Sequence, residues 1–476
     1  MRKLRRTTLI TIFCLCVLAG LGLSRRFAIE PQPWWLIFLP GLFLLRRRNP
    51  AALILVVLLG TSFGLLRGNV YMTKVSELKA LAGQSVVIEA TATADAIYAQ
   101  GSQLEFTANH VVLQPDNKPL AGSFRISGFG EPMVYRGDRL QISGKLYPIR
   151  GASQARISYA QLKRTGLDNS WINSFTRRLG AGMQTALPEP NSSFGLGLLI
   201  GQRNTLPEEL TQQLIMVGLV HIVAVSGYNL TILVRAATRL KLGSKFQQLL
   251  LSLSLISIFI LMTGFSASIV RAAIVSTLGL WAWYYGRRAR PVLILAFTAA
   301  LTAIINPFYI WGDLGWYLSF LAFFGVLVVS PLVISRLFKK RPKLIISVAF
   351  ETLAAEVMTL PLIVAMFGQL SLIGLLSNVL VVPLIPLAML VSTIAAAAGM
   401  WLAPIAGWLA WPANILLTYI LDVVRLFSSI PSIFLHKSIS LASMLYVYAL
   451  VLIVIAIAHK RRVENKIKRL PALKGI

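Results

Sequence analysis

The stretch MRKLRRTTLITIFCLCVLAGLGLSRR, residues 1–26, decides the class of fold. Between its basic ends lies an apolar run of about 18 residues, a length that crosses a hydrocarbon layer of ~30 Å as a helix with every backbone amide bonded internally. Comparable runs recur along the 476 residues, of which 56% are hydrophobic and 13% charged. Because further runs follow almost at once, we expect an uncleaved first span rather than a signal peptide. The sequence therefore predicts a polytopic α-helical membrane protein.

Membrane topology explains much of the positive charge. Lys and Arg total 46 and Asp and Glu 17, which gives a formal net charge of +29. About half of the basic residues lie at the termini and in short loops between apolar runs, where the positive-inside bias places them. These clusters occupy residues 1–6, 46–48, 235–245, 286–290, 335–343 and 460–469. The bias predicts cytosolic N- and C-termini, and the net charge alone does not indicate a nucleic-acid partner.

Residues 67–170 differ in kind from the apolar runs. Segments such as QSVVIEATATA and GDRLQISGKLYPI alternate apolar and polar residues, with turn residues between them. This period-two pattern predicts short antiparallel strands, and about five of them suit a small β-barrel of OB-like type. The basic loops around it predict an extracytoplasmic location.

The rest of the chain divides into membrane blocks and connecting segments. We expect N-terminal transmembrane helices in residues 1–66, an amphipathic linker in 171–193, a second transmembrane domain in 194–460 and a basic cytosolic tail in 461–476. In the linker, Trp171, Phe175 and Leu179 recur at helical spacing and predict one apolar face suited to the membrane surface. We expect about 11–12 spans in all, one or more of them broken or re-entrant, because VVPLIP interrupts residues 372–404. The spans are expected near residues 7–23, 33–45, 51–66, 213–234, 247–263, 266–285, 291–307, 316–334, 344–366, 372–404, 407–428 and 441–458.

The stretch HIVAVSGYN, residues 221–229, places polar side chains inside an apolar block. His221, Ser226 and Asn229 each cost free energy in hydrocarbon unless they meet partners or water. Gly218 and Gly227 favour a break in the helix. Broken helices at membrane depth expose backbone groups to polar substrates, so we expect a discontinuity that faces a pathway. An interhelical hydrogen-bond cluster without a transport role is the alternative.

The same stretch contains a Ser-Gly pair like that of intramembrane serine proteases, which makes a serine hydrolase an alternative function. A serine nucleophile needs a base within hydrogen-bond reach, and His221 lies roughly 140° around a regular helix from Ser226. The sequence contains neither HxHxDH nor HExxH, and no GxxxxGK[ST] motif. The two cysteines, Cys14 and Cys16, offer no thiolate site. The residues therefore predict no nuclease or ATPase activity, no cofactor and no metal site.

Other polar residues within apolar runs are candidates for a pathway. Arg271 is expected to snorkel to the membrane surface, with a basic pathway as the alternative. Gln369, Ser377 and Asn378 form a second polar cluster before prolines. Glu351 and Glu356 are five residues apart and do not share a helix face, so a neutralised or Arg-paired carboxylate is expected rather than a metal pair.

Four motifs in order resemble the ComEC family of competence DNA-uptake channels. They are GLLIGQRNTLPEELTQQLIMVGLVHIVAVSGYNLTIL (197–233), GFSASIVRAAIV, PFYIWGDLGWYLSFLAFFGVL and TLPLIVAMFGQLSLIGLLSNVLVVPL. The family carries an extracytoplasmic OB-like domain after its first spans, so the resemblance covers nearly the whole chain. His221, Ser226 and Gly227 fall on its "H…SG" positions, and Arg203 falls in the preceding "GxR". Asn229 stands where the family often has histidine, and Gln202 stands where it often has an acidic residue.

The resemblance implies passage of single-stranded DNA across the bacterial cytoplasmic (inner) membrane during natural transformation, by one chain or a homodimer. It also implies a DNA receptor, a cytosolic helicase-like ATPase and membrane lipid as partners. Many members carry a C-terminal metallo-β-lactamase-like domain; this chain ends at Ile476 soon after its last predicted span, so a separate nuclease is expected. A small-molecule or polysaccharide permease is the alternative among transporters, for which inverted repeats are the expected signature.

A DNA conduit should offer basic side chains outside the membrane, because each nucleotide brings one negative charge. The candidates for this DNA approach surface are Arg125, Arg136, Arg139, Lys145, Arg150, Arg156, Lys163, Arg164, Arg177 and Arg178. Phe124, Phe129 and Tyr135 are candidate stacking faces, and core packing is expected for at least one of them.

Overall fold

A computed structural model describes most of the chain. The described residues are 5–27, 50–99, 103–149, 153–166, 170–202, 205–223, 227–239, 243–264, 267–287, 290–338, 340, 342–371, 373–430, 434–436 and 439–469. They fall into two compact units. Unit 1 comprises residues 1–206, 223–317 and 389–414, and unit 2 comprises residues 207–222, 318–388 and 415–476.

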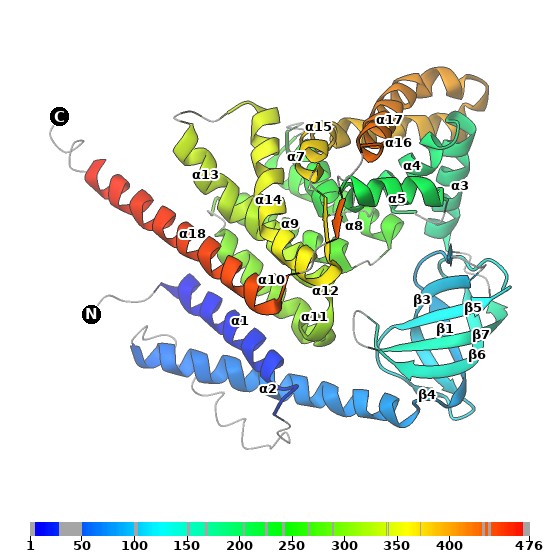
Figure 1. Cartoon of the computed structure of the whole chain (residues 1–476), viewed down its shortest axis with the longest axis horizontal. Helices are drawn as coiled ribbons and strands as arrows, with labels where there is room; N and C mark the ends of the chain where they lie inside the picture. Colours follow the sequence, from blue (N-terminus) through cyan, green and yellow to red (C-terminus); the bar gives the residue numbers. More distant parts are fainter. Residues whose placement is uncertain are drawn as a thin grey trace. The chain divides into compact units, whose positions relative to one another are not determined.

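The order of elements separates two membrane blocks by a strand domain (Figure 1). The first helices are α1 (Arg6–Leu23) and α2 (Pro50–Ala80). The strands are β1 (Ser85–Ala92), β2 (Ile97–Ala99), β3 (Gln103–Gln114), β4 (Lys118–Pro119), β5 (Phe124–Phe129), β6 (Arg139–Pro148) and β7 (Ala155–Gly166). Then follow α3 (Trp171–Ala186), α4 (Asn191–Ile200), α5 (Glu208–Met216), α6 (Val220–Val223), α7 (Gly227–Arg239), α8 (Lys245–Thr263), α9 (Ala267–Tyr284), α10 (Pro291–Ile305), α11 (Phe308–Gly312) and α12 (Leu314–Phe324). The last elements are η3 (Gly325–Val329), α13 (Ser330–Leu337), α14 (Leu344–Phe367), β8 (Gln369–Ser371), α15 (Gly374–Val381), η4 (Val382–Leu384), α16 (Ile385–Trp401), η5 (Ala403–Ile405), α17 (Ala406–Ser428), β9 (Phe434–His436) and α18 (Leu441–Arg469).

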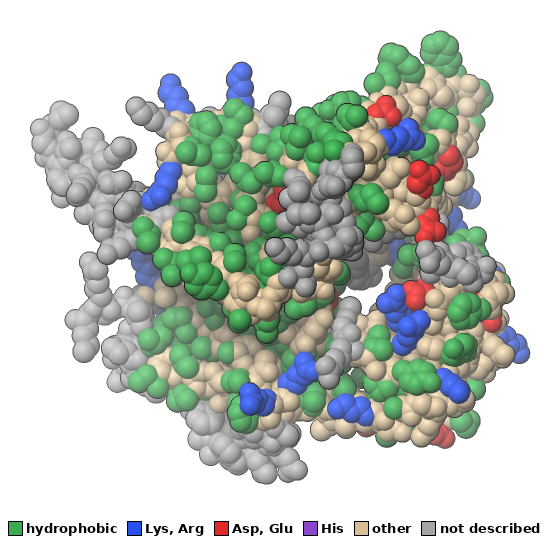
Figure 2. Space-filling model, in the orientation of Figure 1, with side chains coloured by type: hydrophobic (Ala, Val, Ile, Leu, Met, Phe, Trp, Pro, Cys, Tyr) green, Lys and Arg blue, Asp and Glu red, His purple; other side chains and the backbone are tan. Residues whose placement is uncertain are grey.

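The prediction of a polytopic helical membrane protein is confirmed. Eight helical segments among the described residues are long and apolar enough to cross a membrane, and three shorter apolar helices accompany them. Figure 2 shows many hydrophobic side chains on the visible surface of the helices. On α18, for example, Leu452, Ile453 and Val454 are exposed. Exposed apolar surface on this scale is stable only against lipid or a partner. The span expected at residues 33–45 lies outside the described residues.

The strand domain closes on itself. β1 pairs with both β6 and β3, and the sequence of neighbours β1-β6-β7-β5-β3 returns to β1. All of these pairings are antiparallel except that of β5 with β7, which is parallel. A ring in which each strand has two neighbours leaves no open edge, as in a small barrel. The narrower OB-like class remains a prediction.

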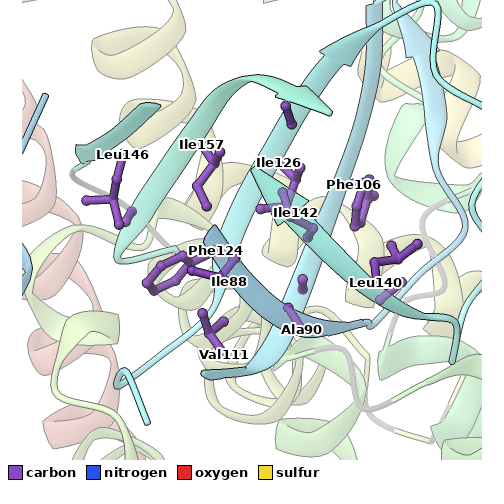
Figure 3. Packing of buried hydrophobic residues seen from close by; sticks show 14 of the residues in the cluster. Ile88, Ala90, Phe106, Val111, Phe124, Ile126, Leu140, Ile142, Leu146 and Ile157 are labelled. Atoms are coloured by element: carbon purple, nitrogen blue, oxygen red, sulfur yellow. The ribbon is translucent and has the colours of Figure 1, made fainter. Parts of the chain in front are cut away.

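The interior of this ring is apolar because alternate residues of each strand point inward. Figure 3 shows Phe124, Ile126, Ile142 and Ile157 directed toward one another from three strands, and each is fully buried. Burying one such side chain contributes about 1.5–3 kcal/mol. Phe124 is thus a core residue rather than a stacking face, as expected for at least one of the three aromatic candidates.

The structure differs from the predictions at the end of α2 and in the buried face of α3. α2 continues from its apolar half through the polar segment up to Ala80, so the first strand begins only at Ser85. In α3, Leu179 is buried, but Trp171 is 72% exposed, and the buried face includes Gly180, Gly182 and Met183 instead. These three side chains therefore do not share one buried face, and the membrane-surface role of the linker stays a prediction. The buried face differs because small residues of α3 allow close contact with the backbone at Ala396, 2.5 Å from where a side chain on Gly182 would begin.

The predicted interruptions of the spans are present. Where one span was expected at residues 213–234, α5 ends at Met216, and a turn at residues 217–219 separates it from α6. In residues 374–401, the tighter turn η4 at Val382–Leu384 separates α15 from α16, at the first proline of VVPLIP.

Candidate functional site

Several polar residues of the second membrane block meet in unit 2, at the turn that follows α5. Gly218 has φ +73°, a left-handed conformation that glycine adopts without steric cost. A side chain placed on it would begin 3.2 Å from Cα of Gly374, the first residue of α15. The start of α15 therefore packs directly on the backbone of this turn.

Ser377 bonds the two segments. Its hydroxyl lies 2.6 Å from the carbonyl oxygen of Val217 and 2.9 Å from that of Gly374, and its side chain is fully buried. The next residue, Asn378, is 4% exposed and hydrogen-bonds the carboxyl of Glu356 in α14. The two predicted polar clusters, around His221 and around Asn378, are thus joined through the turn at Gly218.

His221 lies one turn beyond Gly218. Its Nδ1 is 3.0 Å from the carbonyl oxygen of Gly218. Since a carbonyl only accepts, Nδ1 carries the hydrogen, and Nε2 of the neutral ring is then available as an acceptor. The side chain of His221 is exposed. This arrangement holds the imidazole in one orientation and leaves one nitrogen for a ligand.

Gly227 and Asn229 belong to unit 1, where Asn229 links α7 to α4. Gly227 begins α7 and is buried. Nδ2 of Asn229 donates to the carbonyl of Leu198 at 3.2 Å, and Asn229 is 2% exposed. The carbonyls in the last turn of a helix lack helical partners, so this amide satisfies one of them in α4. Asn229 therefore has a structural contact of the kind that the alternative interpretation of HIVAVSGYN predicted.

Arg271 does not snorkel to the surface, and that expectation is wrong. It is 2% exposed, and its Nη2 donates to the carbonyl of Gly315 at 3.0 Å. The carboxylate of Asp313 and the hydroxyl of Tyr309 also interact electrostatically with the guanidinium of Arg271. A buried guanidinium is tolerated when charge and hydrogen bonds offset its desolvation. Here α11, Asp313 and the start of α12 provide them.

Several candidate cations of the strand domain face outward on β6 and β7. Arg139, Lys145 and Lys163 are exposed, and these two strands carry no acidic residue. The register pairs Gln141 with Lys163 and Lys145 with Ser158, which places the basic side chains along one surface. Figure 2 shows Lys and Arg side chains spread over the visible face of the strand domain, among some Asp and Glu.

Other candidates of the strand domain have acidic partners. Arg125 and Arg156 share the carboxylate of Glu105, which is 3.5 Å from Arg156 Nη2 and also pairs with Arg125. Arg164 lies 3.1 Å from the buried carboxylate of Asp138. These pairs reduce the positive charge that the side chains offer to an anion.

Arg136 is anchored rather than presented to a ligand, contrary to expectation. Its two terminal nitrogens donate to the carbonyls of Leu261 and Met262 at 2.8 and 2.9 Å. Those carbonyls belong to the last turn of α8, where a cation is favourable. In the linker, the guanidinium of Arg177 lies 5.5 Å from the ring centre of Tyr135, and Arg178 is exposed.

Some predicted residues lie outside the described residues. They are Arg150, Arg203 and Ser226, together with the side chain of Gln369, whose backbone pairs with that of His436 between β8 and β9. Among the described residues, no group of three or more His, Cys, Asp and Glu side chains could hold a metal ion.

A family model described as "Competence protein" matches residues 198–462. The chain belongs to the competence protein family. This match confirms the resemblance that the four motifs indicated. The match includes the turn at Gly218, α7 and the helices from α8 to α17. These elements carry the polar residues of the second membrane block.

This competence protein is also similar to "ComE operon protein 3" of Bacillus subtilis (strain 168). The two are 25% identical over 215 residues, which cover 44% of this chain and 26% of the relative. The chain thus aligns with about a quarter of the length of that relative. No solved structure matches the chain.

Sequence reasoning missed three features of the site in this competence protein. Glu356 and Asn378 are 22 positions apart and meet only because α14 and α15 pack together. Tyr159 and Phe129 form an exposed aromatic pair with ring centres 6.3 Å apart. The role of Gly374 depends on the turn at Gly218, and only its place beside the polar cluster marked it.

Proposed function

We propose that this competence protein forms the conduit through which single-stranded DNA crosses the bacterial cytoplasmic membrane during natural transformation. The observation that carries the proposal is the family match over residues 198–462, which contain the interrupted helices of the membrane block. A passage for a polyanion needs polar groups at membrane depth, and continuous apolar helices do not supply them.

The interruptions supply such groups in each unit. In unit 2, the turn at Gly218 positions the exposed side chain of His221, and Ser377 of α15 holds this turn. In unit 1, Gly227 is the first residue of α7 and is buried. We assign the pathway to this segment, with Arg203, Ser226 and Gln369 as further candidates on the strength of the sequence. Asn229 and Arg271 act as structural supports of the pathway, because both are buried in hydrogen bonds to backbone carbonyls.

The strand domain supplies the surface that meets the DNA. Arg139, Lys145 and Lys163 can contact phosphates, and Phe129 and Tyr159 offer exposed rings on which bases stack. Under the positive-inside bias, this domain is extracytoplasmic and both termini are cytosolic. A DNA receptor would deliver the strand, and a cytosolic ATPase and a nuclease would act on either side of the passage.

The first experiment is an in-frame deletion in a naturally transformable host that carries this gene. We expect the deletion to abolish transformation by chromosomal DNA while labelled DNA still binds the cell surface. Wild type should restore transformation, and Gly227→Leu should not, because a large side chain at this buried position disrupts the start of α7. Gly279→Ala is the control, since a side chain there has nothing within 4 Å. Normal transformation of the deletion strain would contradict the proposal.

A second experiment tests the approach surface by binding. The double variant Lys145→Glu/Lys163→Glu of the full chain in lipid nanodiscs is titrated with a fluorescent single-stranded oligonucleotide at several salt concentrations. Each lost phosphate contact should reduce the slope of log K against log salt by about 0.7. Lys74→Glu, an exposed position on α2, is the control. Equal slopes for the double variant and the wild type would remove β6 and β7 from the surface.

A further inference from the structure

Glu356 occupies the middle of a membrane-spanning helix. The apolar span of α14 runs from Ile346 to Phe367, so Glu356 lies ten residues from its start and eleven from its end. An ionised carboxylate at this depth costs several kcal/mol unless a cation, a proton or a polar cavity offsets its charge. A carboxyl group retained at such a position therefore calls for a partner.

Glu356, Asn378 and Ser371 each have a buried side-chain oxygen that can accept a further hydrogen bond. Asn378 donates its amide N–H to the carboxyl, which leaves Oδ1 of Asn378 and Oε2 of Glu356 buried and without partners. The hydroxyl of Ser371 is likewise buried and without a partner. A side chain on Gly374 would begin 3.2 Å from Oε1 of Glu356 and 3.5 Å from Oγ of Ser371. The carboxyl and the hydroxyl therefore flank one small space that the absence of a side chain at Gly374 leaves open.

No basic side chain compensates the carboxylate within the described part of the chain. The elements packed against α14 are η3, α13, α15, η4, β8 and α18. Their described titratable side chains are Arg336 on α13 and Tyr446 and Tyr448 on α18, and α14 itself carries Glu351. Tyr448 donates to the backbone of Met358 instead. Glu356 is partly buried and receives a hydrogen bond from the Asn378 amide.

The chemistry of these three oxygen ligands indicates which ion the site binds. A carboxylate, an amide oxygen and a hydroxyl are hard oxygen ligands, and one carboxylate balances one positive charge. The turn at Gly218 adds backbone at the same place, since a side chain there would begin 3.8 Å from Cβ of Ser371. Interrupted helices with free carbonyls beside an intramembrane carboxylate are the setting in which transporters bind Na⁺ or H⁺. We propose that Glu356, Asn378 and Ser371 form a binding site for a single small monovalent cation, H⁺ or Na⁺.

This site is tested without DNA, so its failure and that of the proposed conduit are distinguishable. The purified full chain in detergent is heated at fixed pH while Na⁺ replaces N-methylglucamine at constant ionic strength, and then at constant Na⁺ across a pH series. A ligand that binds only the folded state raises Tm. A Na⁺-dependent rise in Tm identifies Na⁺. A difference in the pH dependence of Tm between the wild type and Glu356→Gln, without any effect of Na⁺, identifies H⁺.

Variants locate the effect. Glu356→Gln keeps the shape of a neutral carboxyl and should abolish the Na⁺ effect, or remove the part of the pH dependence that belongs to Glu356. Glu351→Gln, on the same helix, should preserve that dependence. Ser371→Ala removes one neutral ligand and should weaken apparent Na⁺ affinity by about three- to tenfold. If Glu356→Gln fails to fold, direct binding of radioactive Na⁺ and the infrared band of a protonated carboxyl in the wild type replace it. The proposal is overturned if Na⁺ has no effect on the wild type and Glu356→Gln has the same pH dependence, or if the Na⁺ effect persists in Glu356→Gln.

Discussion

The contact between the turn at Gly218 and the start of α15 predicts the effect of a single methyl group. Gly218→Ala introduces two costs. A non-glycine residue at φ +73° pays about 1–2 kcal/mol for the left-handed conformation. The new Cβ also lies 3.2 Å from Cα of Gly374, which is tighter than ordinary van der Waals contact, so α15 must move by a few tenths of an ångström.

A matched variant separates these two costs. Gly286 has φ +63°, and a side chain placed there has nothing within 4 Å. Gly286→Ala therefore pays the conformational cost alone. The difference between the two variants measures the packing of the turn on α15, for which overpacking suggests about 1–3 kcal/mol.

Hydrogen exchange of the α15 amides, residues 374–381, is the assay. If the loss of stability is local, amides of α15 in Gly218→Ala should exchange about 5- to 150-fold faster than in the wild type, while those in Gly286→Ala should not change. Transformation should fall in the first variant and persist in the second at equal membrane levels. Equal exchange in α15 for both variants would refute the inference that the turn at Gly218 holds this part of the site.

Three further substitutions probe the supports of the site. Arg136→Ala removes two charged hydrogen bonds to the end of α8 and should lower Tm of the purified chain through a loss of about 1.5–3 kcal/mol per bond, while the exposed Arg178→Ala should leave it unchanged; equal Tm values would contradict the anchoring role. Phe124→Ala should cost about 3–5 kcal/mol and accelerate exchange of the strand amides, whereas Phe129→Ala, at a 53% exposed position, should not. Ser377→Ala removes the hydroxyl that donates to the carbonyl of Val217 and should destabilise α15 by about 1–3 kcal/mol, measured by the same exchange assay; unchanged exchange would argue against that bond.

The class of fold was predictable because its signals are local. Apolar runs of sufficient length and period-two alternation in residues 85–166 depend on neighbouring residues, and the structure places helices and strands accordingly. The interruption at VVPLIP followed from the chemistry of proline. The end of α2 was missed although Tyr71, Val75 and Leu78 recur at i, i+4 and i+7 in its second half and are buried, because the polar residues between them suggested that the helix had ended.

The candidate site was predictable only in part, since its contacts join residues distant in sequence. His221 and Asn378 each stood out as polar residues in apolar runs, but nothing in their spacing showed that the backbone at Gly218 and Gly374 connects them. The roles of Arg136 and Arg271 were mispredicted for the same reason. Each guanidinium binds carbonyls of a segment far along the chain, and a sequence shows a positive charge without showing its partner.

The most direct test of the central proposal follows the DNA itself. Cells with and without this chain receive double-stranded DNA labelled on one strand, and label protected from added nuclease is measured separately in the cytosol and outside the cytoplasmic membrane. The proposal predicts that, without the chain, label accumulates at the cell surface or outside the cytoplasmic membrane, while protected single-stranded label in the cytosol disappears and returns with the wild-type gene. Single-stranded label that reaches the cytosol equally well without the chain would contradict it.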